Sequence, residues 1–306
     1  MTASVRVAPD LLLTTLVSEP ERGEGGLASY RGNWGAAFVE RIVRWLEPKR
    51  VLDPAVGGGT TVAVCQRLGV QVEGYDLNPH PPLGQGGFDM RRDEPAYAPD
   101  AILLHPPYGN LVRYSGGVWG ERPDPRDLSA IDDWPTFVRE MNSTILHLWA
   151  TLRVHGHMAV LVGDIVRHGA IQSMQHELAW CGTPIRTIIK VQHNARSYRA
   201  TYRGTFVPVV HEYLLVFSKD EPYGVRVVYT VTRDVDLRRR DLTWLQIVQA
   251  SVEALGGRAD LTAVYDEVAR QFGERVAQAQ WWREKVRQVL QGPRFVRLER
   301  GVYGLA

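Results

Sequence analysis

Two short segments contain the residues whose types and spacing could carry chemistry. The first runs from Asp53 to Thr60 and reads DPAVGGGT, and the second is His105-Pro106-Pro107-Tyr108. Consecutive glycines allow a backbone to approach a ligand closely, and a helix that begins just after them offers free N–H groups. Consecutive prolines remove two N–H donors, so carbonyl oxygens become the main groups presented.

An acid follows the glycine turn at the position expected for a nucleoside site. Asp76 lies within the segment GYDLNP at 74–79, and a carboxylate there can accept hydrogen bonds from both hydroxyls of a ribose. Two other nucleotide sites fit less well. A phosphate loop of the G-x-x-x-x-G-K-[ST] type needs a lysine that this turn lacks. A dinucleotide-binding turn favours a small residue where Val62 stands, and Asp53 would repel a pyrophosphate.

The double-proline segment indicates how a poorly reactive nitrogen could be activated. The exocyclic amino group of a base is a weak nucleophile because its lone pair is delocalised into the ring. Acceptors at the side chain of His105 and the carbonyl of Pro106 would take its hydrogens and draw that lone pair toward an incoming methyl group. Tyr108 could stack on a base that is flipped out of a duplex. Taken alone, the segment is equally typical of a proline-rich turn with an aromatic ring packed on it.

Both segments follow predicted strands. Strands and helices alternate along the chain, which predicts an α/β fold of the Rossmann-like type with a mostly parallel sheet. The last strand is expected to run antiparallel, because the loop before it lacks a helical pattern. We expect strands at 50–52, 70–75, 101–104, 158–162, 185–191 and 212–217, and helices at 38–46, up to 68, 134–152 and 170–180. The glycine turn and the double proline then lie at one edge of the sheet.

Together, these segments resemble motifs of the amino-methyltransferase family of DNA methylases, which act on N4 of cytosine or N6 of adenine. The glycine turn up to Thr61 is similar to the family's cofactor motif DPFxGSGTT, and the segment 74–79 to its ribose-binding motif. His105 to Tyr108 matches the catalytic [DNS]PPY motif in three of four places, and 211–217 resembles a late-strand motif. The resemblance covers roughly residues 27 to 219.

The resemblance implies S-adenosylmethionine as the cofactor, with no metal. The segment from Tyr30 to Trp34 looks like the part that closes over the methionine end, where Asp53 would help to hold the positive charge. Asp89 stands where the family places an acid beside the cofactor adenine. The implied cofactor-binding residues are Tyr30, Gly32, Asn33, Trp34, Asp53, Pro54, Gly57, Gly59, Thr60, Thr61, Asp76, Leu77, Asn78 and Asp89. The implied catalytic residues are His105, Pro106, Pro107 and Tyr108.

The departure from the family motif is His105, which leaves the target base open. Aspartate or asparagine at this place accompanies mostly adenine, and serine or threonine accompanies cytosine N4. A neutral histidine accepts one hydrogen bond, which is closer to the serine enzymes and favours cytosine N4, with adenine N6 as the alternative. Activity is expected to fall at acidic pH as His105 becomes protonated. Methylation at cytosine C5 needs a cysteine nucleophile, and neither Cys65 nor Cys181 lies in a Pro-Cys turn.

Basic and aromatic residues alternate in two loops that could contact DNA. The first loop, 109–133, is long and polar, which is typical of functional or mobile loops. The second follows the strand at 185–191. Beyond residue 241 the pattern changes to three helices and a terminal hairpin, which predicts a winged-helix module whose third helix enters a groove. The expected DNA-binding residues are Arg113, Tyr114, Arg196, Tyr198, Arg199, Arg203, Arg283 and Arg287.

The predicted domain organisation is a flexible N-terminus at 1–26, a catalytic domain at 27–220, a linker at 221–240 and the winged-helix-like domain, a small α+β unit, at 241–306. The 306 residues, 44% hydrophobic and 23% charged, are typical of a soluble globular protein. The two cysteines form no zinc spacing and no disulfide framework, which suits the cytoplasm. No signal peptide or membrane span is expected.

The predicted function is site-specific methylation of duplex DNA by base flipping, as a monomer or a homodimer. A cognate restriction endonuclease is a partner that this interpretation allows. Three alternatives stay open: an RNA or protein methyltransferase with a similar turn, a winged-helix regulator that senses a nucleoside without turnover, and a C-terminal module that binds protein.

Overall fold

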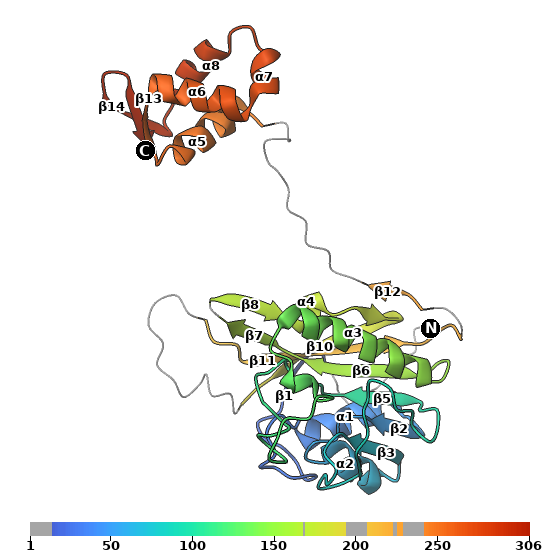
Figure 1. Cartoon of the computed structure of the whole chain (residues 1–306). Coiled ribbons are helices and arrows are strands. Elements are labelled where there is room, and N and C mark those ends of the chain that lie inside the picture. Colours follow the sequence, from blue (N-terminus) through green and yellow to red (C-terminus); the bar gives the residue numbers. More distant parts are fainter. Residues whose placement is uncertain (1–13, 168, 194–206, 223–224, 229–241) are drawn as a thin grey trace. The chain divides into compact units, whose positions relative to one another are not determined.

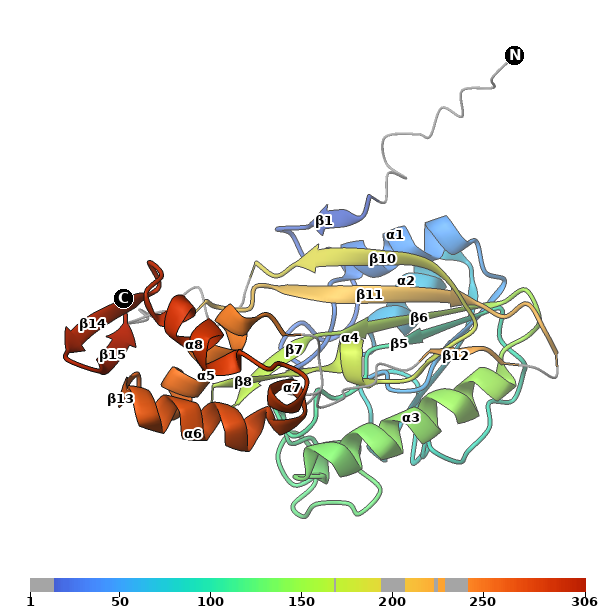
Figure 2. The ribbon, with the colours of Figure 1, turned by 90° about the horizontal axis from the view of Figure 1, so that it is seen from above.

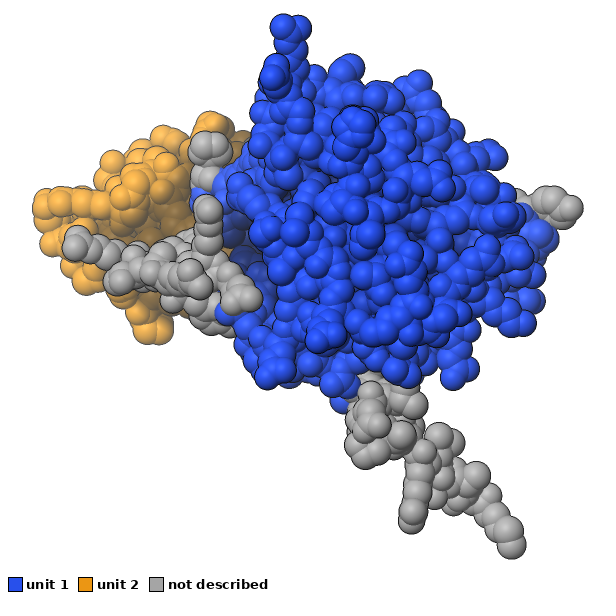
Figure 3. Space-filling model, turned by 90° about the horizontal axis from the view of Figure 1, so that it is seen from below, with its two compact units in different colours: residues 1–230 blue, residues 231–306 orange. Residues whose placement is uncertain are grey.

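The computed structural model describes residues 14–167, 169–193, 207–222, 225–228 and 242–306. The chain divides into two compact units, Met1–Thr230 and Val231–Ala306. Figure 1 labels the elements of both units, and Figure 3 colours each unit separately. The division falls within the segment that the sequence predicts as a linker. Part of that segment has structure of its own, because β12 (Val227–Val228) pairs with β9 (Trp180–Cys181).

The first unit is built on an eight-stranded sheet in the order β1-β10-β11-β6-β5-β2-β3-β4. Neighbouring strands are parallel except at β11, which runs antiparallel to both β10 and β6. The predicted mostly parallel α/β fold and its antiparallel late strand are therefore confirmed. The strands are β1 (Leu16–Ser18), β2 (Arg50–Asp53), β3 (Gln71–Asp76), β4 (Gln85–Gly86), β5 (Ala101–Leu104), β6 (His157–Val162), β10 (Thr183–Val191) and β11 (His211–Ser218).

Helices cover both faces of this sheet. Successive residues of its central strands point to opposite faces, so each of these strands contributes side chains to both cores. In β5, Ala101 and Leu103 belong to the core under α1 (Ala36–Leu46) and α2 (Thr60–Leu68). Ile102 and Leu104 belong to the core under α3 (Trp134–Thr151). Figure 2 shows α1 and α2 on one side of the sheet and α3 on the other. Strands buried on both faces appear in the sequence as uninterrupted apolar runs. The apolar segments 101–104 and 158–162 therefore predicted β5 and β6.

The parallel order brings several strand ends to one edge of the sheet. The carboxyl ends of β2, β3 and β5 lie there, at Asp53, Asp76 and Leu104. Because β11 runs the opposite way, its amino end reaches the same edge, with Tyr213 opposite Val162 at the end of β6. Chemistry-bearing residues after β2, β3 and β5 and at the start of β11 are therefore neighbours in space.

Two segments differ from the prediction. Within the N-terminal segment predicted as flexible, Leu16–Ser18 forms the edge strand β1, parallel to β10. The segment predicted as a helix at 170–180 is instead the strand β8 (Ala170–Ser173), paired with β7 (Asp164–Arg167), followed by the single turn α4 (Met174–Glu177). Pairing with a neighbouring strand supplies backbone hydrogen bonds that a local pattern does not reveal.

The long loop at 109–133 has an internal scaffold centred on one buried carboxylate. Asp127 accepts hydrogen bonds from the backbone and hydroxyl of Ser115 and from the backbone and hydroxyl of Ser129. It also caps the short 3-10 helix η2 (Leu128–Ala130). Four donors on one carboxylate hold both arms of the loop together, so its side chains have defined positions beside the sheet edge.

The second unit contains α5 (Trp244–Ala254), β13 (Arg258–Asp260), α6 (Leu261–Gln271), α7 (Gly273–Ala277), α8 (Trp282–Leu290), β14 (Phe295–Glu299) and β15 (Val302–Leu305). The strands form a sheet in the order β13-β15-β14. The three helices and the terminal hairpin expected beyond residue 241 are present as α5, α6, α8 and the pair β14–β15, and β13 and α7 are additional. The winged-helix assignment stays a prediction. In the described parts of both units, no helix has the length and apolar character needed to span a membrane.

Candidate functional site

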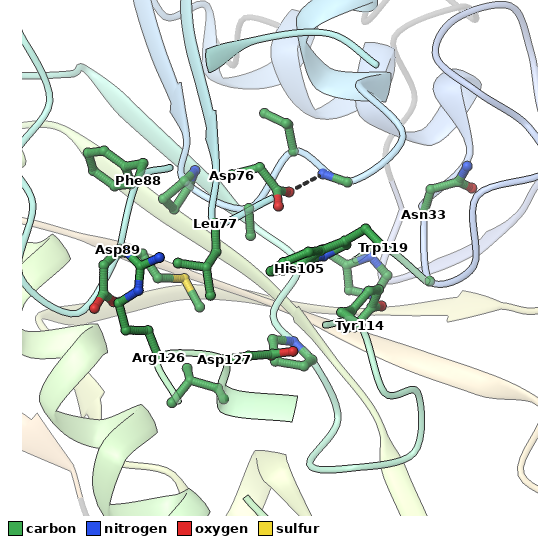
Figure 4. Close-up of a pocket in the computed structure, with 18 of the residues that line it drawn as sticks. Asn33, Asp76, Leu77, Phe88, Asp89, His105, Tyr114, Trp119, Arg126 and Asp127 are labelled. Atoms are coloured by element: carbon green, nitrogen blue, oxygen red, sulfur yellow. Dashed lines mark hydrogen bonds between the residues drawn. The ribbon is translucent and has the colours of Figure 1, made fainter. Parts of the chain in front are cut away.

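A single cavity lies at the sheet edge where the glycine turn and the double proline meet. About 770 Å³ of space in and in front of it, open solvent included, is free of protein atoms. Asp76 and Leu77, at the end of β3, and His105, just after β5, face it (Figure 4). The predicted site residues that line it are Tyr30, Gly32, Asn33, Trp34, Pro54, Gly57, Asp76, Leu77, Asp89, His105, Pro107 and Tyr114.

The glycine turn is tied to the acid at the end of β3 by backbone hydrogen bonds. The backbone N–H groups of Gly57 and Asn78 each donate to one carboxylate oxygen of Asp76, both at 2.8 Å, and Figure 4 marks the first of these. Gly57 has φ of 50°, and a side chain there would press on the ring of Tyr30. Burial raises the pKa of Asp76, and the two N–H donors oppose that rise.

Five of the predicted cofactor residues lie outside the lining of the cavity and support it: Asp53, Gly59, Thr60, Thr61 and Asn78. Asp53 is buried and accepts from the backbone of Ala55. Burial raises the pKa of Asp53 to about 7, against the hydrogen bond from Thr61. Its place behind the turn gives it a role in shaping the turn rather than in direct contact with the cavity.

Aromatic rings form the wall of the cavity opposite the glycine turn. Tyr30 and Tyr114 are stacked, with ring centroids 6.2 Å apart and an interplanar angle of 15°. Gly32 has φ of 80°, and a side chain at this position would collide with the Tyr114 hydroxyl. Trp34 donates to Thr61 at 3.2 Å. The segment predicted to close over the ligand therefore packs directly against the long loop.

The far end of the cavity carries a buried acid that is paired with arginines. Asp89 is 3% exposed and forms ion pairs with Arg91 at 2.9 Å and Arg92 at 3.2 Å. Burial opposes ionisation of Asp89, but its hydrogen bonds from Arg91 outweigh burial and lower its pKa. Phe88, Met90 and Leu128 add an apolar lining beside it. This end therefore combines a flat apolar surface with one ionised acceptor.

The double-proline corner contains a chain of polar side chains from the loop after β5 and from strands β10 and β11. The Tyr108 hydroxyl donates to Glu212 Oε1 at 2.9 Å, and His105 Nε2 lies 3.1 Å from the same hydroxyl. Lys190 Nζ donates to Glu212 Oε2 at 2.7 Å. Glu212 and Lys190 were not among the predicted site residues. Their signal in the sequence is a single acid in the mostly apolar run 212–217 and a single lysine that follows two isoleucines at 188–189.

Burial and charge set the protonation states in this corner. Burial lowers the pKa of His105 to about 4, although Glu212 opposes the shift. Burial alone would raise the pKa of Glu212, but Lys190 and His105 outweigh it, so that its pKa is lowered. Burial and the neighbouring Glu212 raise the pKa of Tyr108 well above its usual value. At neutral pH the corner therefore holds a neutral imidazole, a neutral phenol and an ionised carboxylate.

The neutral imidazole has one nitrogen in use and one free. Nδ1 of His105 is buried and has no hydrogen-bond partner among the described residues. Because burial lowers the pKa of His105 to about 4, the fall of activity predicted at acidic pH is expected near pH 4.

The predicted DNA-binding residues fall in three places. Tyr114 is part of the cavity wall, and Arg113 donates to Asp132 at 2.7 Å and to the carbonyl of Ala130. Arg283 and Arg287 belong to α8 in the second unit, where both guanidinium groups lie over the ring of Tyr265. The remaining four, Arg196, Tyr198, Arg199 and Arg203, lie outside the described residues. In the described part of the chain, no group of three or more His, Cys, Asp or Glu side chains could hold a metal ion.

No family model and no curated protein match this sequence. Solved structures with similarity to the chain include 1,6-didemethyltoxoflavin-N1-methyltransferase from Burkholderia thailandensis, with bound S-adenosylhomocysteine. It is 13% identical, with a TM-score of 0.37, over 61% of this chain and 78% of that chain. TrmN from Thermus thermophilus is 18% identical, with a TM-score of 0.33, over 62% of this chain and 50% of that chain.

A third similar structure is the N-methyltransferase NodS from Bradyrhizobium japonicum WM9, in complex with S-adenosyl-l-homocysteine. It is 11% identical, with a TM-score of 0.35, over 60% of this chain and 86% of that chain. Identities and TM-scores this low identify neither a family nor a substrate. The chemistry of this protein therefore rests on the residues of its own site.

Proposed function

We propose that this protein is an S-adenosylmethionine-dependent methyltransferase that methylates an exocyclic amino group of a base in DNA. The observation that carries the proposal is that an acid suited to a ribose and a neutral hydrogen-bond acceptor line the same cavity. Asp76 supplies the first and His105 the second. Between them lies the glycine turn, at the edge where open α/β sheets bind their ligands.

The residues around the cavity fit the cofactor from end to end. Asp76 accepts from the ribose hydroxyls, and Asp89 accepts from the adenine amino group while Phe88 and Leu128 cover the ring. Tyr30 and Trp34 enclose the methionine end beside the turn. The aromatic faces of these two residues attract a positively charged sulfonium. All of these groups are in place before a ligand arrives, which limits the ordering that binding requires.

The corner acts on the amino group that receives the methyl group. Nδ1 of His105 and the carbonyl of Pro106 accept its two N–H hydrogens, which raises the electron density on nitrogen. The bound cofactor supplies an electrophilic methyl group: the amino lone pair forms the new N–C bond while the C–S bond breaks toward sulfur. The nitrogen then releases one proton to His105 or to water, so that a neutral methylamino group remains. Most of the acceleration comes from alignment and electrostatics.

We favour N4 of cytosine in duplex DNA as the target, reached by base flipping, with N6 of adenine as the alternative. His105 contributes one acceptor atom and no charge, which resembles a hydroxyl more than a carboxylate. Arg283 and Arg287 on α8 support a DNA partner, because both are cationic and both guanidinium groups lie over the ring of Tyr265. A regulator that binds a nucleoside without turnover would not need the free acceptor Nδ1.

One experiment tests the proposal directly. Duplex DNA of mixed sequence is incubated with the full chain and methyl-labelled cofactor, digested to nucleosides and analysed by mass. We expect N4-methylcytosine from the native protein and no methylated base from Tyr108→Ala, with cofactor affinity largely kept. The matched control is Tyr213→Phe, which removes a hydroxyl from the neighbouring position of β11. Labelled N6-methyladenine would change the target, and no methylated nucleoside at all would overturn the proposal.

A further inference from the structure

Glu212 and Lys190 form a buried ion pair behind the double-proline corner, outside the lining of the cavity. The two residues are direct partners in the antiparallel register of β10 and β11. Their side chains are only 15% and 7% exposed, for lysine and glutamate respectively. A buried ion pair is weak evidence for stability, because desolvation offsets most of the attraction. The position of this one, in contact with a predicted catalytic residue, calls for a chemical explanation.

The donors and acceptors along the chain of side chains determine where each proton lies. Lys190 can only donate, and the ionised Glu212 can only accept. Tyr108 has one proton, and a carboxylate at 2.9 Å competes for it better than a neutral ring nitrogen at 3.1 Å. The Tyr108 oxygen is then left as an acceptor toward His105. The nearby nitrogen of His105, Nε2, must therefore carry the ring proton.

The consequence appears at the other ring nitrogen. In a neutral imidazole only one nitrogen carries a proton, so a proton on Nε2 leaves Nδ1 with a free lone pair. Nδ1 is the buried atom that has no partner among the described residues, and the ring that contains it faces the cavity (Figure 4). Glu212 Oε1 also lies 3.8 Å from Nε2, which adds a further electrostatic preference for the proton on that side.

We propose that Lys190 and Glu212 are positioning residues that act through Tyr108 to hold His105 in the tautomer with its proton on Nε2. Nδ1 is thereby kept as the acceptor for the amino group of the substrate. The inference rests on the proposed function for its purpose, but the tautomer itself is a property of the protein alone. An aspartate or asparagine at position 105 would supply a fixed acceptor. Here the ion pair, acting through Tyr108, fixes which nitrogen of His105 is the acceptor.

Replacing Glu212 by glutamine should reverse the direction of the hydrogen bonds from Glu212 through Tyr108 to His105. The amide oxygen stays with Lys190, its strongest donor, so the amide NH₂ faces the Tyr108 oxygen and donates to it. Tyr108 then donates to Nε2, and the ring proton moves to Nδ1, where it blocks the acceptor. A histidine locked in the wrong tautomer loses most of its catalytic effect. We expect turnover of Glu212→Gln to fall about 100-fold, with cofactor affinity unchanged within about twofold.

The tautomer is read by ¹H–¹⁵N correlation spectra of the histidine ring nitrogens in the full chain, with the signals of position 105 assigned by their loss in His105→Gln. The native protein should show the proton on Nε2, and Glu212→Gln should show it on Nδ1. Tyr213→Phe, on the same strand, should leave the native pattern unchanged. A native ring protonated on Nδ1, or a Glu212→Gln ring still protonated on Nε2, overturns the proposal.

A second pair of variants covers the case in which Glu212→Gln does not fold. Lys190→Arg keeps a positive donor and should keep the native tautomer. Lys190→Met removes it, so that the buried carboxyl takes up a proton, donates to Tyr108 and reverses the chain. If both lysine variants show the same tautomer, the proposal fails. If the native tautomer is as expected but no DNA is methylated, the proposed function fails and the positioning role of the pair stands.

Discussion

The two halves of the cavity differ in the kind of group that builds them: backbone in one half and side chains in the other. The half around Gly57 and Asp76 is built from backbone: N–H groups are bonded to a carboxylate, and a glycine stands where a side chain would strike Tyr30. The half around His105 is built from side chains that form one chain of hydrogen bonds to Lys190. A ligand cradle requires shape, which backbone supplies, whereas an acceptor of defined protonation requires side chains with matched acidities.

The largest expected effect is that of His105→Ala, which alters only the half of the cavity built from side chains. We expect His105→Ala to lower kcat by about 100- to 1,000-fold, since it removes the acceptor from the reacting amino group. Affinity for the cofactor should change little, because the groups around Asp76 are untouched. Single-turnover methylation and calorimetric titration with the cofactor measure the two effects. A His105→Ala protein with native kcat would show that the amino group is activated elsewhere.

The converse variant, Asp76→Ala, alters the half of the cavity built from backbone. Asp76→Ala removes the acceptor for the ribose and also releases the backbone N–H groups of Gly57 and Asn78. We expect the Kd for the cofactor to rise by about 10- to 100-fold, the value of a net loss of one hydrogen bond to a charged group. At saturating cofactor, kcat should stay within a few-fold of native. Equal losses in Kd and kcat for Asp76→Ala and His105→Ala would mean that the halves do not act separately.

A variant of a second buried lysine, Lys219, tests whether every cation near β11 contributes to catalysis. Lys219, just after β11, donates to the carbonyls of Trp149, Ala150 and Leu152 at the end of α3. We expect Lys219→Met to lower the free energy of unfolding by about 1–3 kcal/mol, because those carbonyls lose a charged donor. Denaturant titration measures this. Turnover of the folded variant should be native, in contrast to Lys190→Met.

The smallest effect concerns pH and distinguishes a buried histidine from an exposed one. His105 is active when neutral, and burial lowers its pKa to about 4, so its contribution is present above that value and is lost as pH falls through it. Between pH 7 and 5.5 the rate of methyl transfer should therefore change little on account of this residue. An ordinary histidine would lose about tenfold over the same interval. A tenfold fall in the measured single-turnover rate would place His105 in contact with solvent.

Sequence spacing was sufficient for the parts of the site that are local. The glycine turn, Asp76 and the double proline each follow an apolar strand, and the parallel order of those strands brings them to one edge. It did not indicate that Tyr114 stacks on Tyr30 in the cavity wall, and the expected contact of Tyr114 with DNA stays a prediction. The scaffold that holds Tyr114 there centres on Asp127, and hydrogen bonds within an irregular loop have no periodicity from which to predict them.

The amino-acid sequence by itself determined the class of fold, the edge of the sheet that carries the chemistry and the types of residue placed there. Only the tertiary structure decided that Lys190 lies opposite Glu212 and that Glu212 reaches Tyr108. The physical reason is strand register: a shift of one residue would turn Glu212 to the other face of the sheet, and the packing of both faces, not the local sequence, selects the register. The protonation of His105 follows from that register, because burial and the neighbouring ion pair exist only in the folded chain.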